Sequence, residues 1–155
     1  MPEQMSIREA GKEDLGSLLE LYKHLHEIDD PLPSTEVLNK MWAGIMDNPA
    51  LYYFFVDYEQ KPVCSCTLSI IPNLTRGARP YGVIENVITH PDYRGRGFAK
   101  AILRHTLDKA WEQGCYKVML LSSSFREGAH LLYEKVGFNK EDKIGFVAKP
   151  AGKKG

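Results

Sequence analysis

The sequence predicts an α/β (α+β) fold in which a mixed β-sheet carries helices on both faces. Segments of alternating polarity are interspersed with segments whose apolar residues recur at helical spacing, and the second half follows the order strand, strand, helix, strand, helix. The chain has 155 residues, 43% hydrophobic and 26% charged, a composition typical of a soluble globular protein. We therefore expect one domain over residues 1–155, with a frayed tail at residues 150–155.

The first third of the chain predicts one strand and two helices. Residues 6–10 form the strand, and apolar residues at helical spacing predict helices over residues 13–26 and 35–46. Pro31 and Pro33 separate the two helices, because the proline ring cannot continue a helical hydrogen-bond ladder.

A hairpin and a third strand are predicted next. Residues 51–57 are rich in aromatic side chains and residues 63–71 alternate in polarity, so the two segments should pair in antiparallel fashion around a turn at residues 59–62. Residues 73–80 are rich in Arg, Gly and Pro and are expected to form a loop. The β-branched segment 81–89 is the third strand.

The remaining elements are a long helix, a strand, a short helix and a closing strand. Apolar residues at helical spacing predict a helix from about residue 99 to a stop signal at Gly114. Residues 117–121 are continuously apolar, which is typical of a strand covered on both faces. The last helix ends at Gly137, and residues 143–149 form the expected closing strand.

The segment that joins strand 81–89 to the long helix has the composition of an anion-binding site. The first N–H groups of a helix have no internal partner, and glycine lets a phosphate approach them without a Cβ in the way. Arg104 is available for the outer phosphates of such a ligand. A tight turn without a ligand is the alternative. The predicted anchor consists of Arg94, Gly95, Arg96, Gly97, Phe98, Ala99 and Lys100.

Charge and cysteine content argue against several classes of protein. Lys plus Arg and Asp plus Glu each total 20, so no global field attracts nucleic acid or an anionic membrane. Cys64, Cys66 and Cys115 lack Cys-x-x-Cys spacing, so we expect neither a disulfide framework nor a metal, and Cys64 and Cys66 should fill one face of a strand. The start lacks a signal-peptide pattern and no apolar run has membrane-spanning length, which predicts a cytoplasmic protein.

Two sequence blocks resemble the GNAT acyl-CoA N-acyltransferases. Arg94-x-x-Gly97-x-Ala99 fits the family's Arg/Gln-x-x-Gly-x-Gly/Ala signature, and the segment from Ala129 to Phe138 resembles its late helix, which ends in Tyr-Glu-x-x-Gly-Phe. The blocks lie about 35 residues apart, in the family's order. The resemblance implies an acetyl-CoA-dependent N-acetyltransferase with a mostly antiparallel sheet. It also implies that strands 81–89 and 117–121 splay apart to admit the pantetheine arm.

The resemblance also assigns roles to single residues. Tyr133 stands where the family places its general acid, with simple packing on the helix as the alternative. Glu85 is the candidate base for the acceptor amine, because a carboxylate inside an apolar strand is out of character unless that face opens on a cavity. A sheet-face glutamate, exposed or paired to Arg, is the alternative. A backbone N–H within residues 85–88 is the expected oxyanion donor, and Val87 and Ile88 are the expected pantetheine contacts.

One position departs from the family pattern. Many relatives have Asn three residues before the helix alanine, where this chain has Arg126. The usual asparagine contact to the cofactor is therefore not provided at this position, and Arg126 is a candidate for binding a phosphate or the substrate instead. Ser122 and Ser124 are candidates to supply the lost hydrogen bond.

The sequence does not specify the acceptor. Glu85, Tyr52, Tyr53 and the loop at residues 73–80 are the candidates to line its site. We expect a small-molecule amine, with a protein amine as the alternative, and a homodimer is a possible assembly. A non-catalytic acyl-CoA-binding module on the same fold is the second hypothesis, which Tyr133 and Glu85 disfavour. A dinucleotide or ATP enzyme fits poorly, because the third glycine and a Gly-Lys-Ser/Thr sequence are missing.

Overall fold

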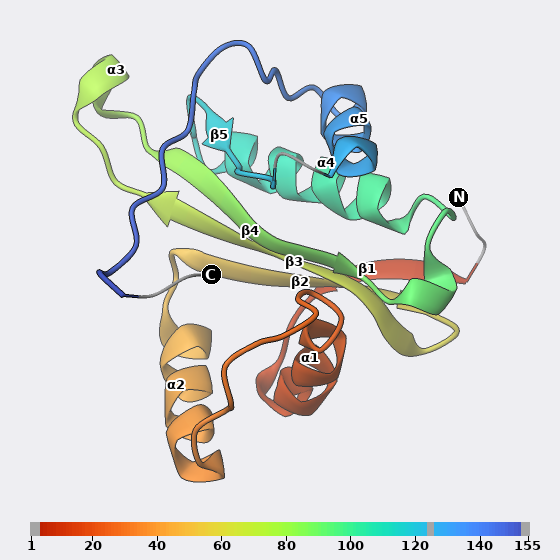
Figure 1. Ribbon diagram of the computed structural model, residues 1–155. Helices are drawn as coiled ribbons and strands as arrows, with labels where there is room; N and C mark the ends of the chain where they lie inside the picture. The colour runs from red at the N-terminus through yellow and green to blue at the C-terminus, as the bar shows by residue number, and fades with distance from the viewer. Residues whose placement is uncertain (1–3, 124–125, 153–155) are drawn as a thin grey trace. The chain divides into compact units, whose positions relative to one another are not determined.

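The computed structural model describes residues 4–123 and 126–152 (Figure 1). The chain divides into two compact units, Met1–Leu120 and Leu121–Gly155. The first unit holds the β-sheet, and the second holds helix α5 (Glu127–Lys135). Within the described residues, no helix has the length and apolar character needed to cross a membrane.

The sheet of the first unit has five strands in the order β1-β2-β3-β4-β5. Neighbours from β1 to β4 pair antiparallel, and β4 pairs with β5 in parallel. The predicted mixed sheet is therefore confirmed. The strands are β1 (Met5–Glu9), β2 (Leu51–Tyr58), β3 (Lys61–Ile71), β4 (Tyr81–Thr89) and β5 (Val118–Met119).

Helices cover both faces of this sheet, as predicted. Helix α4 lies on one face, and α1 and α2 lie on the other (Figure 1). The helical segments of the first unit are η1 (Lys12–Asp14), α1 (Leu15–Tyr22), α2 (Thr35–Asp47), α3 (Thr75–Ala78), η2 (Pro91–Tyr93) and α4 (Phe98–Glu112).

The central strand β3 is buried on both sides. Its Cys66 side chain contacts Thr106 of α4 at 3.2 Å. Its Ser65 pairs across the sheet with Phe55, which packs in a cluster with residues of α1 and α2. Alternating polarity in this strand therefore does not mark a solvent-exposed face, because the small polar side chains of β3 lie under a helix layer as well.

The first helix is shorter than its apolar pattern predicts. Helix α1 ends at Tyr22, and tighter bonds follow it, from His24 N to Leu21 O at 3.0 Å and from Leu25 N to Tyr22 O at 3.1 Å. Bonds of this i to i+3 type end an α-helix in a single tight turn.

Two predictions about the last strands were wrong. The strand expected over residues 117–121 is reduced to β5, and Leu121 is 58% exposed instead of covered on both faces. As an edge strand, β5 pairs with β4 only at two positions. Residues 143–149 form no strand, and Phe146 is 90% exposed. A lone strand has no partner for its backbone groups, and no other described segment of residues 121–155 is a strand.

Candidate active site

The turn between β4 and α4 is open and built around two glycines. Gly95 and Gly97 have φ angles of +77° and +85°, a region that strains any residue with a Cβ. A Cβ placed on either glycine would meet no heavy atom within 4 Å. The glycines therefore satisfy the backbone conformation and leave the space beside the turn free for a ligand.

Helix α4 presents unpaired N–H groups at this turn. Its first backbone hydrogen bond runs from Ala101 N to Gly97 O at 3.0 Å, so the N–H groups of Phe98, Ala99 and Lys100 have no partner within the helix. The Phe98 side chain is only 1% exposed and its ring lies 5.2 Å from that of Tyr58. Phe98 can therefore offer a ligand its N–H group but not its side chain.

The cationic side chains around the turn fall into two groups. Arg96 lies over the ring of Tyr93 at 5.3 Å and over that of Tyr58 at 5.8 Å, and Arg94 Nε donates to Thr89 O at 3.3 Å. Lys100 and Arg104 lie one helical turn apart on α4. Neither is in an ion pair within the part of the chain that the structure describes. This second group is free to bind phosphate oxygens.

Strands β4 and β5 separate after two residue pairs. Gly82 pairs with Val118 and Val83 pairs with Met119, whereas β4 continues to Thr89. The splayed strand pair is thus confirmed. Beyond Val83, this edge of β4 makes no further pair with β5.

A β-bulge interrupts β4 in this splayed part. Thr67 pairs with Glu85 and Ser65 pairs with Ile88, so two residues of β4 stand opposite Cys66 alone. The first of them, Asn86, has a φ angle of +54°, a conformation that Asn adopts more readily than most residues. A bulge leaves a residue out of the hydrogen-bond ladder. The expected oxyanion donor within residues 85–88 coincides with this bulge.

The two predicted pantetheine contacts, Val87 and Ile88, differ in burial. Val87 is half-buried, and Ile88 is only 4% exposed and belongs to the core cluster on the α1/α2 face. The Ile88 side chain therefore packs inside the protein, and only its backbone remains for a contact with a cofactor.

Glu85 and Tyr53 share one face of the sheet. Glu85 is exposed, makes no ion pair with the described residues, and pairs with Thr67, which in turn pairs with Tyr53. The Tyr53 ring meets Trp42 of α2 edge-on at 5.5 Å, which marks this as the α1/α2 face. Tyr52 lies on the opposite face, where Lys109 of α4 approaches its ring at 5.7 Å. The structure therefore brings Tyr53 together with Glu85 but not Tyr52.

Two side chains on the α1/α2 face were missed by sequence reasoning. The hydroxyl oxygens of Tyr22 and Thr67 are buried and make no hydrogen bond with the described residues. Burial raises the pKa of Tyr22 to about 12, and the nearby side chains of Thr67 and Asn86 offset part of this rise. An asparagine inside a β-branched strand was the available signal, because Asn is depleted in strands and tolerates the bulge conformation.

The second unit carries the remaining predicted site residues. Tyr133 of α5 is half-buried, with its ring 6.1 Å from that of Phe138, and Phe138 N donates to Tyr133 O at 3.0 Å. Arg126 precedes α5, and its N–H donates to Ser123 O at 3.0 Å. The Ser122 hydroxyl is buried without a hydrogen bond to the described residues. Ser124 lies outside the described residues.

The cysteines and acidic residues suggest no other chemistry. Burial raises the pKa of both Cys64 and Cys66 to about 12, which keeps these thiols protonated and unreactive. Among residues 4–123 and 126–152, no group of three or more His, Cys, Asp or Glu side chains is placed to hold a metal ion.

The acetyltransferase (GNAT) family model matches residues 15–138. The chain belongs to this family. A curated relative within it is a glucosamine 6-phosphate N-acetyltransferase from Trypanosoma brucei brucei, 36% identical over 143 residues, which is 90% of this chain and 92% of that protein. The resemblance of the two sequence blocks to GNAT enzymes is confirmed, and the protein is an acyltransferase.

Solved structures of GNAT acetyltransferases share the fold along most of the chain. A putative acetyltransferase from Agrobacterium tumefaciens str. C58 is 42% identical with a TM-score of 0.87, covering 94% of this chain and 99% of that one. An acetyltransferase from Clostridium acetobutylicum, crystallised with acetyl-CoA, is 22% identical with a TM-score of 0.74, covering 93% of this chain and 96% of that one. At this lower identity the likeness concerns the fold alone.

Proposed function

We propose that this GNAT protein transfers the acetyl group of acetyl-CoA to a primary amine of a small molecule. The observation that carries the proposal is the occurrence, along one stretch of chain, of the β4 bulge at Asn86 and the open glycine turn that leads into α4. The similarity to a glucosamine 6-phosphate N-acetyltransferase supports an amino-sugar phosphate as the first acceptor to test.

The glycine turn fits the pyrophosphate of acetyl-CoA. The N–H groups of Phe98, Ala99 and Lys100 would donate to its oxygens. The side chains of Lys100 and Arg104, which make no ion pair with the described residues, would balance its charge. The open space beside Gly95 and Gly97 would admit the phosphates without a steric clash. Acetyl-CoA, when bound, supplies a thioester whose carbonyl carbon accepts the amine.

The β4 bulge and Glu85 would act on the two reacting groups. A backbone N–H freed at the bulge would donate to the thioester oxygen as negative charge develops on it. An alkylamine is only about one part in a thousand free base at pH 7, a handicap of roughly 4 kcal/mol. Glu85, exposed and without an ion pair among the described residues, would hold the ammonium group and take its proton, directly or through water.

Tyr133 would return a proton to the leaving sulfur. A C–N bond forms while the C–S bond breaks, and the departing thiolate needs a proton. A phenol with an ordinary pKa near 10 can supply one to a thiolate whose conjugate acid has a pKa of about 8.5. Tyr133 stands in α5 four residues before Gly137, within the family's late block, which supports this role.

The test of the phosphate anchor compares the two glycines that flank α4. Gly97 precedes the helix and Gly114 follows it, both have positive φ angles, and neither would bring a new Cβ within 4 Å of another atom. Gly97→Val and Gly114→Val should therefore lose similar amounts of stability through backbone strain. Only Gly97→Val should weaken acetyl-CoA binding measured by calorimetry. Equal acetyl-CoA affinity in both variants would mean that the anchor lies elsewhere.

The test of transfer follows thiol release from acetyl-CoA with glucosamine 6-phosphate and a panel of other primary amines. We expect Tyr133→Phe to bind acetyl-CoA normally and to turn over about 10²–10⁴-fold more slowly, the usual loss for a general acid. An unchanged turnover number would reduce Tyr133 to a packing residue. Binding of acetyl-CoA without transfer to any amine would contradict the proposed function.

A further inference from the structure

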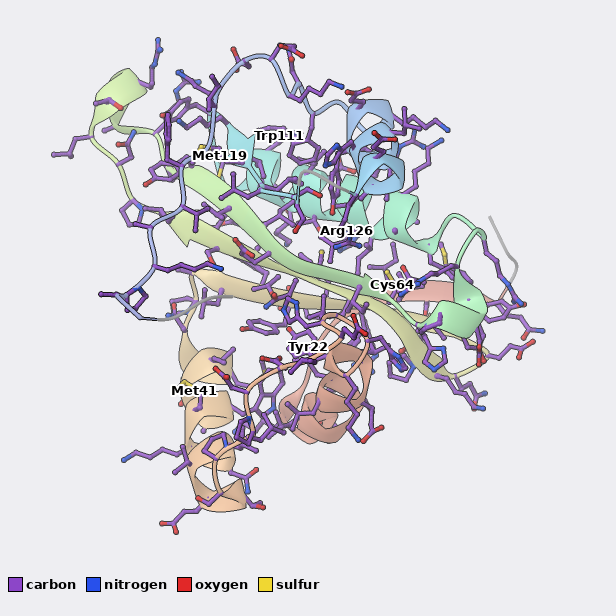
Figure 2. The ribbon with its side chains drawn as sticks, viewed as in Figure 1. Tyr22, Met41, Cys64, Trp111, Met119 and Arg126 are labelled. Carbon is purple, nitrogen blue, oxygen red and sulfur yellow. The ribbon has the colours of Figure 1, made fainter. Side chains whose placement is uncertain are left out.

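The hydroxyls of Tyr22 and Thr67 are buried close to each other on the α1/α2 face, and neither makes a hydrogen bond of good geometry with the described residues. Thr67 is only 6% exposed, and neither hydroxyl oxygen makes a hydrogen bond with the described residues. Figure 2 shows Tyr22 in the space between α1 and the sheet. An unpaired buried polar group typically costs about 1–3 kcal/mol, so native proteins seldom keep two such groups near one another without a reason.

Other buried hydroxyls near the sheet are paired. The Ser65 hydroxyl donates to Phe54 O at 2.8 Å, and the Thr106 hydroxyl donates to Ile102 O at 2.7 Å. Ser65 is two residues from Thr67 on the same strand and the same face. The lack of a hydrogen bond at Tyr22 and Thr67 is therefore a local property of the region beside the β4 bulge.

The Tyr22–Thr67 pair lies next to the group proposed to hold the amine. Thr67 pairs across the strands with Glu85, and side chains at such positions have Cβ atoms about 4.5–5.5 Å apart. The Asn86 side chain is near the Tyr22 phenol. Tyr22 is half-buried, and Glu85 and Asn86 are exposed. A ligand would reach the two hydroxyls from the side of Glu85 and Asn86, whose exposed side chains can move without a change in the core.

We propose that the hydroxyls of Tyr22 and Thr67 bind the hydroxyl group that neighbours the amine of the acceptor. They would thereby make the enzyme selective for amino alcohols of the amino-sugar type over simple alkylamines. The inference rests on the proposed function, because it assigns a substrate class to the same site.

The chemistry of the pair suits a neutral hydroxyl and not a charge. Each hydroxyl both donates and accepts, so a ligand hydroxyl can accept from one and donate to the other. Neither can balance an ammonium group, which Glu85 is placed to do. Because burial raises the pKa of Tyr22 to about 12, its phenol remains a neutral donor at the pH of the reaction.

The experiment measures kcat/KM for glucosamine 6-phosphate and for its 1-deoxy and 3-deoxy analogues, each of which lacks one hydroxyl next to the amine. The wild-type enzyme should discriminate against one analogue by about tenfold or more, the effect of one or two lost hydrogen bonds. Tyr22→Phe and Thr67→Val should each lower kcat/KM for glucosamine 6-phosphate by about tenfold. Both variants should leave kcat/KM for the disfavoured deoxy analogue nearly unchanged. Equal losses on both acceptors, or no loss on either, would overturn the inference.

Two matched variants and two further readouts separate specificity from folding. Tyr116→Phe lies just before β5 and Thr106→Val lies in α4, so both are away from the Tyr22–Thr67 pair. They remove a phenol and a threonine hydroxyl in turn, and each should leave the preference for glucosamine 6-phosphate over its deoxy analogue unchanged. Tyr22→Phe removes an unpaired group, so its free energy of unfolding should not fall. Calorimetric binding of glucosamine 6-phosphate should weaken about tenfold in Tyr22→Phe, whether or not the acceptor turns over, and an unchanged affinity would overturn the inference.

The two proposals fail in different ways. If the wild-type enzyme acetylates no amine in the panel, the proposed function fails. If it acetylates simple alkylamines as well as their hydroxylated counterparts, the proposed function stands and the inference about Tyr22 and Thr67 is wrong.

Discussion

The two faces of the sheet in the first unit bury the same kind of apolar side chain but differ in their polar groups. Phe54 on the α4 face and Phe55 on the α1/α2 face are both fully buried. On the α4 face, the Thr106 hydroxyl is paired with Ile102 O and contacts Cys66 Sγ at 3.2 Å. On the α1/α2 face, the hydroxyls of Tyr22 and Thr67 make no hydrogen bond of good geometry with the described residues. Apolar packing therefore stabilises both faces, and among the described residues of the sheet and the helices packed on it, the buried hydroxyls without a hydrogen bond lie on the α1/α2 face.

The largest effect expected from this comparison concerns Glu85 on the α1/α2 face. Glu85→Gln should lower the turnover number about 10²–10⁴-fold near neutral pH, where little acceptor amine is free base. The deficit should shrink as the pH approaches the pKa of the amine, because a base then becomes redundant. The pH profile of acetyl transfer measures this. The free energy of unfolding should stay the same, since Glu85 is exposed and makes no ion pair with the described residues.

The contrary result for Glu85 is equally specific. A raised KM for the acceptor at neutral pH with an intact turnover number would identify Glu85 as a residue that positions the ammonium group and does not take its proton.

The buried thiols of the α4 face should make the protein sensitive to alkali. Cys64 and Cys66 have pKa values raised to about 12 by burial, whereas an unfolded chain ionises its thiols near pH 8.5. Above about pH 8.5 the unfolded state releases protons that the folded state retains. Stability is therefore full below that pH and falls as the pH rises toward 12, by up to about 1.4 kcal/mol per pH unit for each thiol.

Urea midpoints at pH 7, 9 and 11 measure the alkaline effect. Cys66→Ala should give a shallower decline with pH, because one buried thiol no longer contributes. Tyr22→Phe should change the decline only above about pH 10, where an unfolded tyrosine begins to ionise. A decline that is identical in all three proteins would show that these burial effects do not control alkaline stability.

A smaller effect is expected from the bulge itself. Asn86→Ala should cost roughly 1–2 kcal/mol, because alanine is strained at a φ angle of +54°, whereas Asn86→Gly should keep the conformation with less strain. If the bulge acts through its backbone N–H, Asn86→Gly should also retain more acetyl transfer than Asn86→Ala. Thermal unfolding and turnover of the two variants test this order, and the reverse order would contradict it.

The smallest effect compares one threonine from each face. Thr106→Val should lower the free energy of unfolding by about 0.5–1.5 kcal/mol, because a satisfied hydrogen bond is lost. Thr67→Val should leave it unchanged or raise it, since valine has the same shape and removes an unpaired hydroxyl. Urea unfolding measures both. Equal losses of unfolding free energy in the two variants would mean that the two threonine hydroxyls are equally well hydrogen-bonded.

Features that depend on short stretches of chain were predictable. The glycine turn follows from local backbone chemistry, because Gly95 and Gly97 adopt positive φ angles and stand immediately before a helix. The hairpin of β2 and β3 was predicted from a turn between two strand-like segments, and its two turn residues Glu59 and Gln60 also have positive φ angles. The roles of Tyr133 as acid and Glu85 as base stay predictions.

The sequence by itself determined the order of the elements from β1 to α5, the family and the glycine turn before α4, because these depend on residue type and spacing along the chain. Tertiary structure alone decided which side chains meet. Tyr52 and Tyr53 must point to opposite faces of a strand, but only the pairing of β2, β3 and β4 puts Tyr53 on the face of Glu85. Tyr22 and Thr67 lie 45 positions apart in the chain. Their unpaired hydroxyls arise only when α1 packs on β3, because whether a buried group finds a partner depends on every element around it.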